Sequence, residues 1–88
     1  DILLWSDFDE CFENDDIKAT LDYSLIIHRV KSHSKNFSCF TIEKYSEEII
    51  KIIQSEFNPD RIKIILTKCN PPIDGFNGKV SIVRFFEK

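Results

Sequence analysis

SEEIIKIIQSEFNPDRIKIILTK, residues 46–68, joins the clearest helix of the chain to its clearest strand. Residues 46–57 carry apolar side chains at helical spacing, which predicts a helix with one apolar face: Ile49, Ile52, Ile53 and Phe57. Ser46 is a suitable N-cap, and Asn58-Pro59 should end the helix because the residue before a proline avoids helical angles. The same stripe continues back to Ile42, so an earlier start is an open alternative.

Two later segments have the period of a strand. Residues 61–68 and 79–86 both alternate apolar and polar side chains, which indicates two strands. The connection between them contains both glycines of the chain, Gly75 and Gly78, each in a turn pair with Asp or Asn. We therefore expect these glycines to supply positive φ angles in the connection.

The N-terminal half is less clear. Residues 20–31 alternate like a strand, and residues 37–42 would return from it as the second half of a hairpin. A helix through Ile17 and Leu25, capped by Asp15 or Asp16, is the competing interpretation of this segment. Residues 2–12 fit either a short strand followed by a loop, or a helix that begins at Asp7 after a Ser6 cap.

Together these segments predict one α+β domain over residues 1–88. We expect a small antiparallel sheet of about four strands with one main helix, 46–57, packed on one face. The sheet would use residues 20–31, 37–42, 61–68 and 79–86. A βαβ arrangement around the helix is also possible, because the connection from 37–42 to 61–68 is long enough.

Composition and charge restrict the function classes. The chain is 42% hydrophobic and 31% charged, as expected of a globular domain, and its net charge of −3 disfavours a nucleic-acid partner. The three cysteines form no CxxC pair, which indicates a reducing compartment and a cytoplasmic protein. No apolar run approaches the roughly 18 residues that would span a bilayer, so we expect no membrane association.

The acids gather at one end of the chain. Residues 1–17 hold seven of the fifteen acidic residues and no lysine or arginine. Aromatic side chains stand between these acids, and this composition is typical of protein-binding hot spots. Core aromatics with the acids turned to solvent are the alternative. Lys79 directly follows Gly78 and could hold a phosphate or a carboxylate, or simply be a surface lysine. The candidate binding residues are Trp5, Asp7, Phe8, Asp9, Glu10 and Lys79.

No catalytic motif is visible. The spacing of His28, His33 and Cys39 lacks the second ligand pair of a zinc site, and the acidic run lacks the loop of an EF-hand. There is no phosphate-binding glycine pattern and no nucleophile signature. We therefore predict no metal, no cofactor, no catalytic residue and no enzymatic activity.

Two parts of the chain resemble the cyanobacterial KGK-domain family. The C-terminal match comprises IKIIL (62–66), Phe76, Gly78-Lys79 and VSIVRFF (80–86), and the acidic, aromatic opening DILLWSDFDECF is similar to the start of that family. The resemblance implies a bacterial protein of unknown function and supplies no activity.

The sequence thus favours a non-enzymatic protein-interaction or regulatory module, which binds a protein partner or forms a homo-oligomer through an edge strand or residues 1–17. The first alternative is an acidic inhibitor or immunity-type protein that caps a basic enzyme such as a nuclease. A third is a weak phosphate or nucleic-acid binder that uses a basic face of Lys63, Lys68, Lys79 and Arg84.

Overall fold

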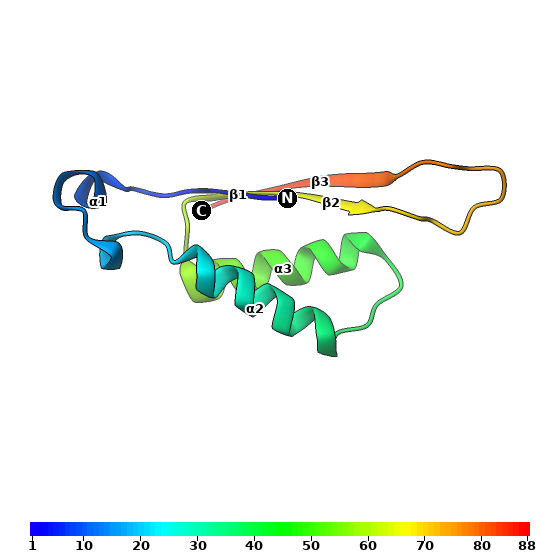
Figure 1. Ribbon diagram of the computed structural model, residues 1–88, viewed down its shortest axis with the longest axis horizontal. Coiled ribbons are helices and arrows are strands. Elements are labelled where there is room, and N and C mark those ends of the chain that lie inside the picture. The colour runs from blue at the N-terminus through cyan, green and yellow to red at the C-terminus, as the bar shows by residue number, and fades with distance from the viewer.

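The computed structural model describes residues 1–88 and has the shape of a long, thin layer of sheet over two helices (Figure 1). The three strands form one antiparallel sheet in the order β1-β2-β3, and α2 and α3 lie on one of its faces. The molecule measures 54 × 24 × 21 Å, because the β2–β3 hairpin extends beyond α2 and α3 at one end and α1 lies beyond them at the other. The elements in chain order are β1 (Ile2–Trp5), α1 (Asp9–Asn14), the 3-10 turn η1 (Ile17–Ala19), α2 (Tyr23–Asn36), α3 (Ile42–Phe57), β2 (Arg61–Lys68) and β3 (Val80–Glu87). The predicted α+β class is confirmed.

The helix predicted over residues 46–57 is present, but it begins one turn earlier, at Ile42. Thr41 is its N-cap, since the Thr41 hydroxyl accepts a hydrogen bond from the Lys44 amide at 3.1 Å. The prediction of Ser46 as the cap is wrong. Ser46 is fully buried inside the helix, where its hydroxyl donates to the Glu43 carbonyl at 2.7 Å. The helix ends as expected at Asn58, which is left-handed (φ 51°) and precedes Pro59.

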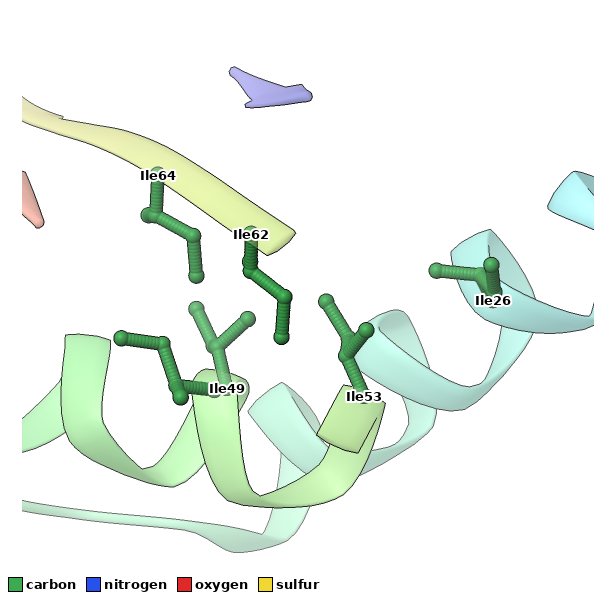
Figure 2. Close-up of a cluster of buried hydrophobic side chains, with 6 residues drawn as sticks. Ile26, Ile49, Ile53, Ile62 and Ile64 are labelled. Atoms are coloured by element: carbon green, nitrogen blue, oxygen red, sulfur yellow. The ribbon is translucent and has the colours of Figure 1, made fainter. Parts of the chain in front are cut away.

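The core is an isoleucine cluster between α3 and β2. Ile49 and Ile53 of α3 point toward Ile62 and Ile64 of β2, and Ile26 of α2 approaches from the side (Figure 2). Ile53 and Ile62 have no exposed surface. Full burial of one such side chain is worth about 1.5–3 kcal/mol, so these few residues supply much of the stability of a chain this short.

The strand register follows from this cluster. All eight residues of β2 pair with β3, from Arg61 opposite Glu87 to Lys68 opposite Val80. β1 pairs with the other edge of β2, from Ile2 opposite Ile64 to Trp5 opposite Arg61. The strands predicted over 61–68 and 79–86 are thus confirmed, the second with a shift of one residue.

The strands predicted over 20–31 and 37–42 are wrong. Residues 23–36 form α2, capped by Asp22, whose carboxylate accepts from the Ser24 and Leu25 amides at 3.0 and 3.3 Å. A strand would have buried Tyr23 and Leu25, which are exposed, whereas the helix turns Ile26 and Val30 to the core at i, i+4. A helix in this segment is therefore correct, but it begins at Tyr23 and not near Ile17, Asp22 is its cap and not Asp15 or Asp16, and Leu25 lies outside its buried face.

Residues 37–41 are the loop between the two helices. The Phe37 ring stacks on His33 of α2 with 4.7 Å between centroids and lies 6.0 Å from the Tyr45 ring of α3. These three rings connect the last turn of α2 to the first turns of α3. The Phe40 side chain, in contrast, is fully exposed.

At the N-terminus the strand interpretation is correct for the first residues and the helix interpretation for the residues that follow. Residues 2–5 are a strand, and a short helix follows from Asp9, two residues later than the helix alternative placed it. Trp5, Phe8 and Phe12 consequently share no helical face, and Phe12 is 78% exposed.

The two glycines have different roles. Gly75 adopts a φ of 77°, as predicted. Gly78 has no positive φ, so that part of the prediction is wrong. A Cβ atom at Gly78 would lie 2.7 Å from Cζ of Phe76, which shows that this glycine makes room for the Phe76 ring.

Ile53→Val tests the core. We expect the free energy of unfolding to fall by about 1 kcal/mol, because the substitution removes one fully buried methylene. Urea unfolding followed by circular dichroism measures the change as a lower midpoint at an unchanged slope. Ile27→Val, at an exposed position of α2, is the matched control and should change stability by less than about 0.5 kcal/mol. Equal losses in the two variants would contradict this placement of the core.

Candidate functional site

A groove lies where the first turn of α3 meets the end of the β2–β3 ladder. It encloses about 310 Å³, and the α2–α3 loop, α3, β2 and the hairpin connection all contribute to its walls. In Figure 1 this is the end of the molecule from which the hairpin extends. The lining residues are Phe40, Thr41, Ile42, Glu43, Lys68, Pro71, Pro72, Ile73 and Val80.

Glu43 and Lys68 are the two charged residues of this groove. The acids that follow Glu43 on α3 already have partners: Glu48 pairs with Lys44 at 3.0 Å, and Glu47 pairs with Arg84 at 2.8 Å. Neither Glu43 nor Lys68 takes part in any ion pair of the structure. The groove thus offers one carboxylate and one ammonium group to a ligand.

The Lys44–Glu48 ion pair shifts the pKa of both of its members. The hydrogen bond from Lys44, followed by its positive charge, holds the pKa of Glu48 below its ordinary value, and the same bond raises the pKa of Lys44. Because the folded-state pKa of Glu48 is lowered, this pair stabilises α3 above the ordinary pKa of a glutamate and loses that effect as the pH falls.

The rest of the groove suits a flat ring that has a polar edge. Ile42, Pro71, Pro72 and Val80 provide apolar walls, with the exposed Phe40 ring at the rim. The first amides of a helix have no partner inside the helix, and in α3 the Thr41 hydroxyl accepts from the Lys44 amide, so the amides of Ile42 and Glu43 are the donors available to a ligand. A ligand that combines an acceptor with neighbouring donors could engage these amides and Glu43 together.

Arg84 of β3 forms hydrogen bonds that link the sheet to α3 beside the groove. Its guanidinium donates to the Ser46 hydroxyl at 3.2 Å and to the Glu47 carboxylate at 2.8 Å, one turn beyond Glu43. The predicted basic face of Lys63, Lys68, Lys79 and Arg84 is therefore not formed. Arg84 turns toward the helix, and the Lys63 ammonium lies over the Phe85 ring at 5.4 Å, on the uncovered face of the sheet.

The structure does not bring the predicted binding residues together. Trp5 lies on β1, where the guanidinium of Arg61 covers its ring at 5.0 Å. Asp7, Phe8, Asp9 and Glu10 follow Trp5 at and before the start of α1, at one end of the long axis. Lys79 lies beyond the opposite end of the β2–β3 ladder, beside the groove.

Sequence reasoning missed both charged residues of the groove. Glu43 was missed because the helix was predicted to begin at Ser46; a threonine N-cap, Thr41, with an acid in the first turn was the signal of the true start. Lys68 was assigned only to a basic face, although its place at the last pair of the ladder, directly before the proline-rich connection, marks a strand end. The structure shows no cluster of three or more His, Cys, Asp or Glu side chains suited to a metal ion.

Comparison with known proteins identifies the class of protein to which this chain belongs. A family model described as FolB, dihydroneopterin aldolase, matches residues 1–84. A "Probable dihydroneopterin aldolase" of Synechocystis is 30% identical over 82 residues, which cover 93% of this chain and 70% of the relative. A dihydroneopterin aldolase of Staphylococcus epidermidis is 36% identical over 83 residues, 93% of this chain and 69% of the relative. The class is thus a family of small α+β enzymes.

A solved structure agrees. The structure titled "putative dihydroneopterin aldolase (FolB)", from Vibrio cholerae, superposes with a TM-score of 0.87 at 22% identity, over 99% of this chain and 72% of that one. This likeness shows that the fold is shared. Together with the family match, the shared fold shows that the chain belongs to the FolB dihydroneopterin aldolase family.

This membership corrects three predictions. The resemblance to the KGK-domain family is wrong: it rested on short apolar runs, and the stretch that names that family is Asn77-Gly78-Lys79 here. The prediction of no enzymatic activity is wrong, because the family and its named relatives are enzymes. The predicted interaction module and its alternative, an immunity-type inhibitor, are wrong for the same reason. No helix of the structure is both long and apolar enough to cross a membrane.

Arg84→Lys tests the link between sheet and helix. Lysine keeps the charge but cannot donate to both Ser46 and Glu47 with a planar fork, so we expect unfolding to become easier by about 1 kcal/mol. Arg29→Lys is the matched control, since Arg29 pairs with Glu56 at the surface alone and should lose no more than about 0.5 kcal/mol. Thermal or urea unfolding reports both, and an Arg84→Lys variant as stable as the wild type would refute the link.

Proposed function

We propose that this protein is a dihydroneopterin aldolase and that the groove between α3 and the β2–β3 hairpin is its pterin site. The observation that supports the proposal is that one groove with apolar walls contains a carboxylate, Glu43, and a lysine, Lys68, neither of which takes part in an ion pair. Family membership supplies the reaction class, and the groove supplies groups that this reaction needs.

The pyrimidine edge of a pterin matches the first turn of α3. That edge carries an amino group and a ring N–H side by side, which are two parallel donors for one carboxylate, and Glu43 is placed to accept both. The neighbouring ring carbonyl is an acceptor for the free amides at the start of the helix. The flat ring system would lie between the apolar walls of the groove.

The aldol cleavage itself needs proton transfer. A base takes the proton from the hydroxyl on C2′ of the substrate side chain, the C1′–C2′ bond breaks, and C2′ leaves as an aldehyde. The electron pair stays on C1′, where the imine of the ring delocalises it until C1′ is protonated. Because one proton is lost and one is gained, a single group that moves protons is sufficient, and we assign this role to Lys68.

Substitutions at the two charged residues test the proposal. Glu43→Gln should weaken pterin binding by about 10- to 100-fold, because it removes the charged acceptor. Lys68→Met should lower kcat by about 100-fold or more, with a smaller effect on binding. Chromatographic detection of the hydroxymethyl-dihydropterin product gives the rates.

Matched controls lie at the far end of the molecule. Glu13→Gln on α1 and Lys18→Met on η1 are exposed and should keep the wild-type rate. Wild-type rates in both Glu43→Gln and Lys68→Met, with folding intact by circular dichroism, would overturn the assignment of the site.

A further inference from the structure

Ser46 is a fully buried polar residue of α3, three residues after Glu43. Its hydroxyl takes part in two hydrogen bonds. It donates to the main-chain carbonyl of Glu43 at 2.7 Å and accepts from Nη1 of Arg84 at 3.2 Å. Burial of a hydroxyl without partners is unfavourable, so the place of Ser46 in the core depends on both hydrogen bonds.

The guanidinium of Arg84 fixes the direction of these hydrogen bonds. A hydroxyl group has one proton and can rotate, whereas a guanidinium can only donate. Ser46 therefore accepts from Arg84, and its single proton is left for the Glu43 carbonyl. The same guanidinium donates to the Glu47 carboxylate at 2.8 Å, which holds Arg84 in this orientation. We call Arg84, Ser46 and the Glu43 carbonyl the serine link.

Ser55 shows the same kind of hydrogen bond without an arginine. Its hydroxyl donates to the carbonyl three residues earlier, that of Ile52, at 3.4 Å. The corresponding distance at Ser46 is shorter, as expected for a hydroxyl that a charged donor polarises. Ser55 lies near the end of α3, far from the groove, whereas the serine link lies at the start of α3, where Glu43 lines the groove.

The serine link adds directional contacts to the packing of α3 on the sheet. Apolar burial in the isoleucine cluster is non-directional, whereas a hydrogen bond depends on both distance and angle. Arg84 belongs to β3 and pairs with Ile64 of β2, the strand that ends at Lys68. Two hydrogen bonds thus connect the backbone of Glu43 to the sheet that carries Lys68.

We infer that Ser46 and Arg84 are positioning residues, which hold the first turn of α3 so that the Glu43 carboxylate meets a ligand in the groove; this rests on the proposed function of the groove. Neither residue lines the groove, so neither contacts the ligand there. Their effect passes through the backbone of Glu43. A carboxylate that accepts two parallel hydrogen bonds from a ring edge must be placed to within about 0.5 Å, and the serine link supplies that support.

Ser46→Ala breaks the serine link at its centre, and Arg84→Lys weakens it from the sheet without a change in α3. Ser55→Ala is the matched control, because it removes the same type of hydrogen bond far from the groove. The dissociation constant of 6-hydroxymethylpterin is measured by pterin fluorescence below the thermal midpoint of every variant. We expect it to rise about fivefold in Ser46→Ala and in Arg84→Lys, and less than about twofold in Ser55→Ala.

A double variant separates positioning from a general loss of structure. Because the serine link acts through Glu43, Ser46→Ala should change the dissociation constant less than about twofold when Glu43→Gln is already present. An equal weakening by Ser46→Ala with and without Glu43→Gln would show that Ser46 does not act through Glu43, and it would overturn the inference.

The failures are distinguishable. If Glu43→Gln weakens binding while Ser46→Ala and Arg84→Lys bind as tightly as the wild type, the proposed site stands and the positioning role is wrong. If the wild type does not bind the pterin, or Glu43→Gln binds it as tightly as the wild type, the proposed function of the groove is wrong and the inference falls with it.

Discussion

The packing of the α3 isoleucines on β2 is the constraint on which the rest of the molecule depends. Ile49 and Ile53 can bury their side chains against Ile62 and Ile64 only when the helix lies along the strand (Figure 2). A helix of sixteen residues held in this way reaches the end of the ladder with its first turn. The apolar contact between α3 and β2 therefore places Glu43 and Lys68 in one groove.

Short-range contacts then fix the first turn of α3. The Thr41 cap determines where the helix begins, and the cluster of the His33, Phe37 and Tyr45 rings holds the preceding loop against α2. Arg84 joins the same region to β3 through Ser46 and Glu47. Arg84 pairs with Glu47 and Lys44 pairs with Glu48, so Glu43 is the acid of the first turns of α3 that takes part in no ion pair. Glu43 is thus unpaired in the groove because the neighbouring acids of α3 have partners outside it.

The sequence predicts those elements in which one periodicity is dominant. Residues 46–57 and 61–68 were predicted correctly because their apolar residues fit one period and a proline separates them. Residues 20–31 fit both periods, since alternation through Tyr23 and Leu25 competes with the helical pair Ile26 and Val30. The Asp22 cap and the packing on α3 decide for the helix. The first is a weak local signal, and the second is absent from the sequence.

The site was harder to predict for the same reason. Glu43 and Lys68 are far apart in the chain, no motif spans them, and only the packing of α3 on the sheet brings them to one groove. The acidic, aromatic N-terminus was conspicuous in composition, but there Asp7 caps the Asp9 amide at 3.0 Å and Arg61 covers Trp5. Asp7 and Trp5 thus have structural partners, and the binding role of the N-terminal residues stays a prediction.

We propose that this packing makes one ligand site from the start of α3 and the end of β2. Amide chemical-shift mapping of the nitrogen-15-labelled protein during titration with 6-hydroxymethylpterin is the most direct test. We expect the largest shifts together at residues 40–43, at 68–70, at Ile73 and at Val80, while Trp5 and α1 stay unchanged. Shifts confined to Trp5 and α1, with Glu43 and Lys68 silent, would contradict it.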